Sequence, residues 1–280
     1  MTKYCIVASD FDDTLLRSDL TVSDYTKAVI AEFTAEGGAF LITTGRTNGS
    51  ARKSAARAGL TRGLVISYQG AMIEDLETGE EVLYRPLDWE SAVWHLKKLE
   101  KGPGQVQIYH KDRLYVTRRD ARTAEYERVC EVEAEEVGVP LSEFVEQNRL
   151  ELCKILVIAA PEEAAAMLRD FSAERGGDFY YCLSKPIFFE VLAKGVSKGE
   201  AVRFVAERMG KSLENVLGFG DGINDLPLIE AAAVGFAVEN AQPALKEAAD
   251  CVCPSNDEDG VARTMVAYCG LKEPELPGKE

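Results

Sequence analysis

Two aspartates near the start of the chain have the spacing of a nucleophile and a proton-transfer group. Asp10 and Asp12 lie in Asp10-Phe11-Asp12-Asp13-Thr14-Leu15, directly after the apolar run Tyr4–Ser9. Ligands gather at the carboxyl ends of strands in open parallel sheets, so both carboxylates can enter one crevice. One acid can then attack while the other moves protons. For these six residues alone, a solvated acidic loop or a helix cap is a comparable explanation.

A second acidic segment repeats this arrangement late in the chain. The apolar stretch Val216–Gly220 is followed by Asp221-Gly222-Ile223-Asn224-Asp225. Glycine lets a backbone turn tightly and approach a ligand. Carboxylates at a strand end suit Mg²⁺, which keeps several waters and uses few protein ligands. A loop with Asp225 as a helix cap is the alternative, but the pattern Gly-Asp-Gly-x-Asn-Asp is more specific than a cap requires.

Two further segments carry groups that bind anions. Thr43-Thr44-Gly45-Arg46 ends another apolar run, which brings together a hydroxyl, a flexible glycine and a helix N-terminus. Arg46 could add a bidentate contact. Gly195-Val196-Ser197-Lys198-Gly199 opens a later helix, where the helix dipole disfavours a lysine unless an anion lies nearby. Taken singly, a common Thr-Gly turn and an ordinary surface lysine account for these two segments.

The elements that must position these residues alternate at both ends of the chain. Alternation of strand and helix predicts a parallel sheet with right-handed crossovers. Residues 69–84 have the alternating pattern of an antiparallel hairpin. The expected strands are 4–9, 39–43, 63–67, 215–220, 234–237 and 250–253, and the expected helices are 23–37, 47–58, 197–209, 223–233, 243–249 and 259–268.

The middle of the chain has a different order. Helices and adjacent strands in this order predict an α+β insert and not a continued parallel sheet. We therefore expect a discontinuous core domain of residues 1–84 and 190–280, with an inserted cap at 85–189 and a frayed end at 273–280. Within the insert, helices are expected at 88–101, 121–137 and 162–175, and strands at 105–109, 113–117, 152–159, 179–183 and 187–192.

The bulk composition limits the classes of partner. A formal net charge of -15 over 280 residues argues against a nucleic-acid partner. No apolar run approaches the ~20 residues of a membrane span, and no signal-peptide core precedes the first strand. Seven scattered cysteines argue against a disulfide framework, and neither His95 nor His110 lies near a motif. We expect a cytoplasmic protein without a membrane partner, whose oligomeric state the sequence leaves open.

Together and in this order, the four segments resemble the haloacid dehalogenase superfamily of phosphotransferases. The resemblance covers nearly the whole chain, and the insert resembles the Cof-type, class IIB cap of that superfamily. It implies an α/β fold, with a Rossmann-like parallel-sheet core and an inserted α+β C2B-type cap. Two positions depart from the usual pattern, because Gln69 stands where many Cof-type members have Asn and Asp13 replaces a more usual Gly.

The resemblance implies a phosphatase that works through an aspartyl-phosphate. Asp10 would attack phosphorus, while Asp12 would protonate the leaving oxygen and then deprotonate the hydrolytic water. An acid at position 12 favours rapid dephosphorylation, because ATPases of the superfamily lack it. The implied substrate-binding residues are Thr44, Gly45, Arg46, Lys198 and Asn224.

The resemblance also implies a Mg²⁺ site. The carboxylate of Asp10, the backbone carbonyl of Asp12 and the carboxylate of Asp221 would hold the ion. Asp225 would orient the metal waters and Lys198, and Lys198 would neutralise nucleophile and phosphate together. Cation charge of this kind removes the repulsion between an ionised nucleophile and a phosphate dianion.

The substrate is less defined than the reaction. Small phosphorylated metabolites such as sugar phosphates fit a capped site. A phosphohexomutase shares the nucleophile and acid, and a non-catalytic metabolite-binding protein is a further alternative. Lys154, Ser184 and Lys185 lie near expected strand ends in the insert, where ordinary surface polarity is the favoured interpretation.

Overall fold

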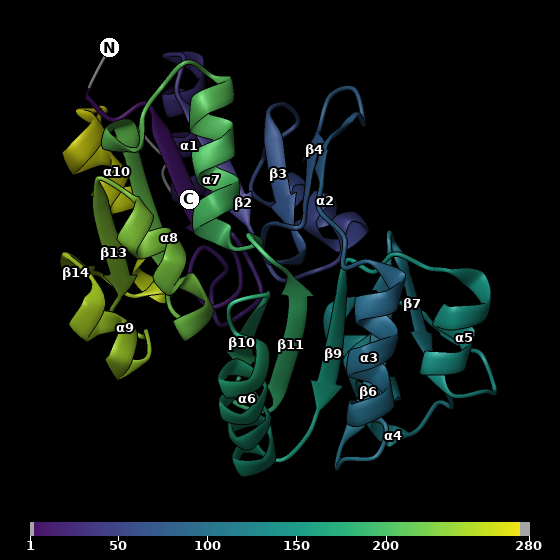
Figure 1. Cartoon of the computed structure of the whole chain (residues 1–280). Coiled ribbons are helices and arrows are strands. Elements are labelled where there is room, and N and C mark those ends of the chain that lie inside the picture. Colours follow the sequence, from purple (N-terminus) through teal and green to yellow (C-terminus); the bar gives the residue numbers. More distant parts are fainter. Residues whose placement is uncertain (1–2, 275–280) are drawn as a thin grey trace.

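Two β-sheets organise residues 3–274, the part of the chain that this computed structural model describes (Figure 1). The eight-stranded sheet has the order β14-β13-β12-β1-β2-β3-β4-β5. Strands β1–β3 and β12–β14 pair in parallel, whereas β4 and β5 form an antiparallel hairpin. Its strands are Ile6–Asp10 (β1), Ala39–Thr43 (β2), Leu64–Ser67 (β3), Met72–Asp75 (β4), Glu81–Tyr84 (β5), Val216–Gly220 (β12), Val234–Val238 (β13) and Cys251–Cys253 (β14).

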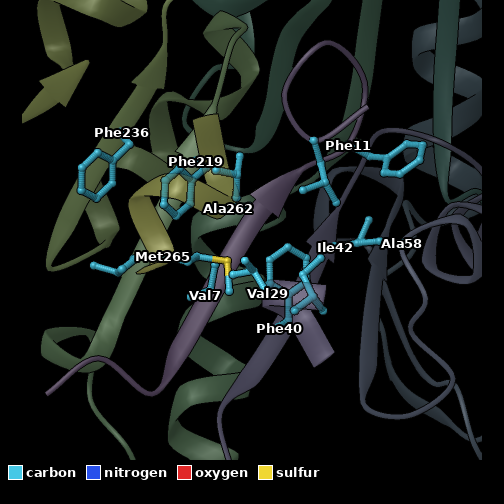
Figure 2. Close-up of a cluster of buried hydrophobic side chains, with 14 of the residues drawn as sticks. Val7, Phe11, Val29, Phe40, Ile42, Ala58, Phe219, Phe236, Ala262 and Met265 are labelled. Atoms are coloured by element: carbon cyan, nitrogen blue, oxygen red, sulfur yellow. The ribbon is translucent and has the colours of Figure 1, made fainter. Parts of the chain in front are cut away.

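Helices cover both faces of this sheet. The central strand β1 is therefore buried on both faces and carries apolar residues on both. Successive residues of β1 point to opposite faces, so Val7 packs with α1, α2 and α10, while Ile6 and Ala8 pack with α7 and α8. Figure 2 shows part of the first cluster, including Val7, Val29, Phe40, Ile42 and Met265. The helices are Asp24–Ala35 (α1), Asn48–Arg57 (α2), Lys198–Arg208 (α7), Leu226–Ala231 (α8), Pro243–Ala248 (α9) and Gly260–Cys269 (α10). The α/β fold with a parallel-rich core is thus confirmed.

Two helix starts are fixed by side-chain caps next to the predicted motifs. The Thr47 hydroxyl accepts the backbone N–H of Ser50 and begins α2 directly after Arg46. The Ser197 hydroxyl accepts the backbone N–H of Glu200 and places Lys198 in the first turn of α7. Each such cap stabilises a helix start by about 1 kcal/mol, so local chemistry holds both motifs in position.

The second sheet has six strands in the order β10-β11-β9-β6-β7-β8 and lies below the eight-stranded sheet in Figure 1. Helices α3, α5 and α6 pack on one of its faces, while α4 and the core residues Tyr68 and Met72 pack on the other. The strands are Gln105–His110 (β6), Arg113–Val116 (β7), Ala134–Glu136 (β8), Lys154–Ile158 (β9), Phe179–Lys185 (β10) and Phe188–Ala193 (β11). The helices are Trp89–Leu99 (α3), Ala121–Cys130 (α4), Leu141–Asn148 (α5) and Pro161–Arg175 (α6).

The sequence-based limits of the insert can be compared with this sheet. The expected limit after residue 84 coincides with the end of β5, whereas the limit after residue 189 falls inside β11, which continues to Ala193. The expected frayed end at 273–280 lies largely outside the described residues. Within them, the carboxylate of Glu273 accepts a hydrogen bond from the Tyr25 hydroxyl.

The helix expected at 121–137 is wrong in its second half. Helix α4 ends at Cys130, and Glu131 takes a left-handed φ of 54°. Residues Ala134–Glu136 then form β8, which pairs in parallel with β7, and α5 follows without having been expected. The charged run favours a helix by composition, but the open edge of β7 and the burial of Ala134 decide the outcome, as tertiary context overrides propensity.

His95 has a structural place that the sequence did not reveal. It is fully buried on α3 among Phe171, Phe179 and Tyr181. The contact with the Ser91 carbonyl requires Nδ1 to donate, so Nε2 accepts from the Tyr181 hydroxyl. Burial lowers the pKa of His95 from 6.5 to about 4.

We expect this histidine to make the protein acid-sensitive. The unfolded chain takes up a proton near pH 6.5 and the folded chain only near pH 4, so stability is complete above 6.5 and falls as pH drops through this window. The loss reaches up to about 3 kcal/mol, at 1.36 kcal/mol per pKa unit. Urea unfolding at pH 7 and pH 4.5 measures it. His95→Gln should show a smaller difference between the two pH values, and an equal difference would contradict the prediction.

Among the described residues, none of the helices is long and apolar enough to cross a bilayer. The cytoplasmic location stays a prediction. All seven cysteines carry free thiols.

Candidate active site

Three neighbouring strands carry the predicted motifs to one edge of the sheet. Strand β1 lies between β2 and β12, with Asp10 opposite Thr43 and Ser9 opposite Phe219. Because all three strands run in parallel, the residues that follow them, Thr44 and Asp221, lie beside Asp10. The strand-end reasoning from sequence therefore describes the real arrangement.

Lys198 forms ion pairs with two carboxylates of the site, Asp10 and Asp225. Its fully buried ammonium lies 2.5 Å from Asp10 Oδ1 and 2.5 Å from Asp225 Oδ1. Burial raises the pKa of Asp10 well above its usual range; Lys198 opposes this, and Asp225, Asp221 and Asp12 add to it. Burial would lower the pKa of Lys198, but Asp10 and Asp225 hold it above its ordinary value. The site thus holds more negative charge than one lysine compensates.

The loop after β12 is folded around Asp225. Asp225 Oδ2 accepts the backbone N–H groups of Asp221 and Gly222, each at 3.0 Å. A Cβ on Gly220 would lie 2.4 Å from Asp225 Cβ, so only glycine fits there. Burial first, and then the Asp225 carboxylate, raise the pKa of Asp221 to about 7.

The donor set of this edge fits a magnesium ion. One carboxylate oxygen each from Asp10, Asp221 and Asp225 lie within 4.8 Å of one another. Both oxygens of Asp225 already accept from Lys198 and the two backbone amides. Asp10 and Asp221 therefore retain free lone pairs. Burial first, and neighbouring carboxylates after it, raise the pKa of each, and a hard cation would stabilise both as carboxylates.

Thr14 contributes to this set, although the sequence reasoning gave it no role. Its hydroxyl donates to Asp221 Oδ1 at 2.9 Å, across 207 residues. The signal was present, because Thr14 belongs to the acidic hexapeptide and follows Asp10 by four residues. The hydrogen bond orients Asp221 beside Asp10.

We expect added Mg²⁺ to raise the melting temperature of the metal-free protein. Binding to the folded state alone stabilises by about 2.7 kcal/mol at a hundredfold excess over Kd. Differential scanning fluorimetry with and without Mg²⁺ measures the shift. Asp221→Asn should remove most of it, whereas Asp170→Asn, an exposed position on α6, should leave it unchanged. An undiminished shift in Asp221→Asn would place the ion elsewhere.

Arg46 holds Asp12 with both ends of its guanidinium. Nε lies 2.8 Å from Asp12 Oδ2 and Nη2 lies 2.5 Å from Oδ1, while Nη1 donates to the Ser50 hydroxyl. The guanidinium also lies 5.5 Å from the centre of the Phe11 ring. The bidentate contact expected for a bound anion is thus made here to the carboxylate of the predicted general acid.

The Thr44 hydroxyl is available as a donor. Its oxygen accepts the backbone N–H of Arg46 at 3.2 Å, so its own proton remains to be donated. Thr44 lines a cavity of about 800 Å³ that lies between the two sheets. The predicted residues that also line it are Asp10, Asp12, Gly45, Arg46, Asp221 and Asn224. Lys198 and Asp225 do not line it and reach the site only through Asp10 and the β12 loop.

A buried ion pair in the second sheet contacts the core at this point. Lys154 Nζ lies 2.7 Å from Glu190 Oε1 and donates to the Gly45 carbonyl at 2.8 Å. Both side chains are about 2% exposed, so the surface interpretation of Lys154 is wrong. Ser184 also points inward and donates to Glu190, whereas Lys185 is half exposed. A lysine inside the apolar run Leu152–Ala159 was the available signal.

Gln69 joins this pair to the core. Its amide donates to Glu190 Oε2 at 3.0 Å and accepts from Asn224 at 3.3 Å. Its backbone is left-handed, with φ 58°, which Asn adopts more readily than Gln. The Gln69 amide thus contacts Glu190 and Asn224 at once, and a Cβ on Gly45 would lie 2.6 Å from its amide nitrogen.

Breaking the ion pair should destabilise the fold. Glu190→Gln leaves the Lys154 ammonium buried without a carboxylate, which costs about 3–5 kcal/mol. Urea unfolding of Glu190→Gln, Lys154→Met and the double variant measures the coupling. The double variant should be more stable than the sum of the single losses allows. Simple additivity would mean that the two charges do not interact.

Comparison with known proteins identifies the family of this chain. The family described as haloacid dehalogenase-like hydrolase matches residues 7–265. The candidate phosphatase YxeH of Bacillus subtilis is 29% identical over 267 residues, covering 94% of this chain and 97% of the relative. The 5-amino-6-(5-phospho-D-ribitylamino)uracil phosphatase YcsE of the same organism is 28% identical, covering 93% and 94%.

Similarity to solved structures supports the same family. A haloacid dehalogenase-like hydrolase from B. subtilis superposes with a TM-score of 0.84 at 25% identity, covering 93% of this chain and 98% of its own. A Thermotoga maritima protein superposes with a TM-score of 0.79 at 28% identity, covering 94% and 97%. The family match spans far more than half of the chain and agrees with the resemblance of the four motifs. The chain therefore belongs to the haloacid dehalogenase-like hydrolases, among relatives that are named phosphatases.

Proposed function

We propose that this hydrolase is a Mg²⁺-dependent phosphatase that hydrolyses small phosphorylated metabolites through an aspartyl-phosphate on Asp10. The observation that carries the proposal is the position of Asp10. Its carboxylate lines the cavity, is held by the buried Lys198, and lies within 4.8 Å of a second carboxylate that can share a cation. A carboxylate poised in this way is a nucleophile for phosphorus.

In the first step, an oxygen of Asp10 forms a bond to phosphorus as the ester P–O bond breaks. Asp12 gives its proton to the leaving alcohol oxygen, and Thr44 donates to a phosphoryl oxygen. In the second step, Asp12 takes a proton from the attacking water, the bond between Asp10 and phosphorus breaks, and inorganic phosphate leaves. When bound by Asp10, Asp221 and the Asp12 carbonyl, Mg²⁺ would supply positive charge at the phosphoryl oxygens.

Arg46 positions Asp12 in this scheme. Both carboxylate oxygens of Asp12 accept from the guanidinium, so the pair fixes the orientation of this carboxylate in the cavity. Donation to the leaving group requires a protonated Asp12, so the guanidinium must turn to another partner in the first step. The phosphoryl oxygens of the arriving substrate offer that partner, since the same fork matches phosphate geometry.

The second sheet acts as the cap, as we propose for residues 85–189, and its residues close the cavity over Asp10. A closed cavity excludes water from the reacting groups and contacts the alcohol. The name of the relative YcsE gives it a small phosphate ester as substrate, which supports the same class for this chain.

A panel of phosphate esters tests the proposal. Protein with Mg²⁺ should release phosphate from p-nitrophenyl phosphate and from at least one metabolite ester, and EDTA should stop the release. Tight binding of an ester without release would support a metabolite-binding protein. Transfer of phosphate back to sugar, dependent on a bisphosphate activator, would support a phosphohexomutase. Either outcome overturns the proposal.

A further inference from the structure

The cavity that Asp10 lines also has an apolar region, which belongs to the cap. We call this region the distal subsite and define it by five lining residues: Tyr126 and Val129 on α4, Ile158 at the end of β9, and Ile187 and Phe188 at the β10–β11 turn. Tyr126 and Phe188 meet edge to face, with ring centres 5.7 Å apart. The side of α4 and the β10–β11 turn therefore form one continuous apolar wall.

Two residues of this wall keep a large part of their side-chain surface exposed. Val129 is 48% exposed and Ile187 is 39% exposed, and both border the cavity that holds Asp10. Apolar side chains left open beside a reactive group mark a surface that a ligand covers. The covering ligand must be the alcohol part of the phosphate ester, because the subsite is continuous with the nucleophile.

A simple sugar is a poor match for this surface. Its hydroxyls would lie against Val129 and Ile187 and lose hydrogen bonds to water without replacement, which is unfavourable. The cavity of about 800 Å³ also lies in the range of roughly 300–1,000 Å³ that holds ligands larger than a single sugar ring. The distal end of the alcohol must therefore be bulky and largely apolar.

The charged neighbours narrow the chemistry further. Arg122 lines the cavity from the face of α4 that carries Tyr126 and Val129, and it forms no hydrogen bond or ion pair with other described residues. Glu125 also lines the cavity from α4, but its carboxylate is paired with Arg128. Lys185, the last residue of β10, also lines the cavity and lies 4.0 Å from Asp13. Cations next to an apolar wall suit a flat ring that carries acceptor atoms at its edge and a π-face for contact.

We propose that the distal subsite binds a planar aromatic or heterocyclic ring, so that the preferred substrates are phosphate esters of ring-bearing alcohols. This inference rests on the proposed phosphatase function and names the substrate class. It assigns specificity to Val129 and Ile187, which contact the ring, and places Arg122 at its polar edge.

Matched esters test the inference. Ribitol 5-phosphate and flavin mononucleotide share the same primary phosphate ester and differ by a ring at the far end. Ribose 5-phosphate and uridine 5′-monophosphate make a second pair. The ring-bearing ester of each pair should have a kcat/KM about tenfold higher or more, the scale of discrimination by an apolar pocket.

Substitutions in the distal subsite test whether its apolar residues cause the preference for ring-bearing esters. Val129→Ser and Ile187→Ser should each lower the ratio of kcat/KM between the paired esters, by about fivefold to tenfold. Val252→Ser is the matched control, because Val252 is also 48% exposed but lies on the edge strand β14 and does not line the cavity. It should leave both kcat/KM values unchanged.

The outcomes separate this inference from the proposed function. Phosphate release with equal preference within both pairs, or with a ratio that both serine variants leave unaltered, overturns the ring subsite and keeps the phosphatase. Release from no ester overturns the phosphatase. In that case, quenching of flavin fluorescence still tests the subsite: binding by wild type that Val129→Ser weakens supports it, and binding that the variant leaves unaltered overturns it.

Discussion

Replacing Asp10 by Asn will abolish phosphate release, with a loss on the order of 10⁴-fold or more. Asn has nearly the same shape but no anionic oxygen to attack phosphorus, and it also weakens the cation site. Single-turnover assays with p-nitrophenyl phosphate measure the remaining rate. The variant should fold at least as well as wild type in the absence of metal, because burial and neighbouring acids disfavour the ionised carboxylate that it removes.

The neighbouring acid supplies the control. Asp13 is exposed, and its nearest ion-pair partner is 4.0 Å away. Its backbone φ of 58° is a conformation that Asn tolerates. Asp13→Asn should keep activity within a few-fold of wild type. Turnover near the wild-type rate in Asp10→Asn would show that another group attacks phosphorus, and the proposed mechanism would have to be abandoned.

Lys198→Met should have the second large effect, on both stability and activity. The variant leaves Asp10 and Asp225 buried without the ammonium that lies 2.5 Å from each. Removing one partner of a buried charge cluster costs about 3–5 kcal/mol, and catalysis loses the charge that offsets the phosphate dianion. Urea unfolding in EDTA measures the stability, and phosphate release measures the activity.

Two comparisons make the result specific. Mg²⁺ should restore part of the lost stability in Lys198→Met, because the ion supplies positive charge to the same carboxylates. Lys194→Met, four residues earlier and exposed, should change neither quantity by more than about 0.5 kcal/mol or its equivalent in rate. A Lys198→Met protein as stable as wild type would mean that the buried acids are neutral in the fold.

The chemistry at the strand ends was readable from the sequence because it is local. An apolar run that ends in an acid predicts a buried parallel strand with a functional residue at its carboxyl end, and β1 and β12 both obey this rule. Cap residues such as Ser197 also act within one helical turn, so the start of α7 and the placement of Lys198 followed from a few neighbouring letters.

Side-chain partners were decided by the tertiary structure. Arg46 pairs with Asp12 across 34 residues, and Lys154 pairs with Glu190 across 36. The apolar run around Lys154 hinted at its burial but not at its partners, because Glu190 and Gly45 come from other segments of the chain. The strand β8 likewise exists because β7 offers it an open edge.

The two aspartates at the start of the chain show the same difference between what local sequence determines and what the tertiary structure determines. Their type, spacing and strand-end position pointed to a nucleophile and a proton-transfer group, and the three other segments made that interpretation specific. The choice of alcohol, in our proposal, depends on a wall built from α4 and the β10–β11 turn. These segments are separated by more than fifty residues and meet only when the second sheet folds, because side-chain packing between distant segments is a property of the folded chain.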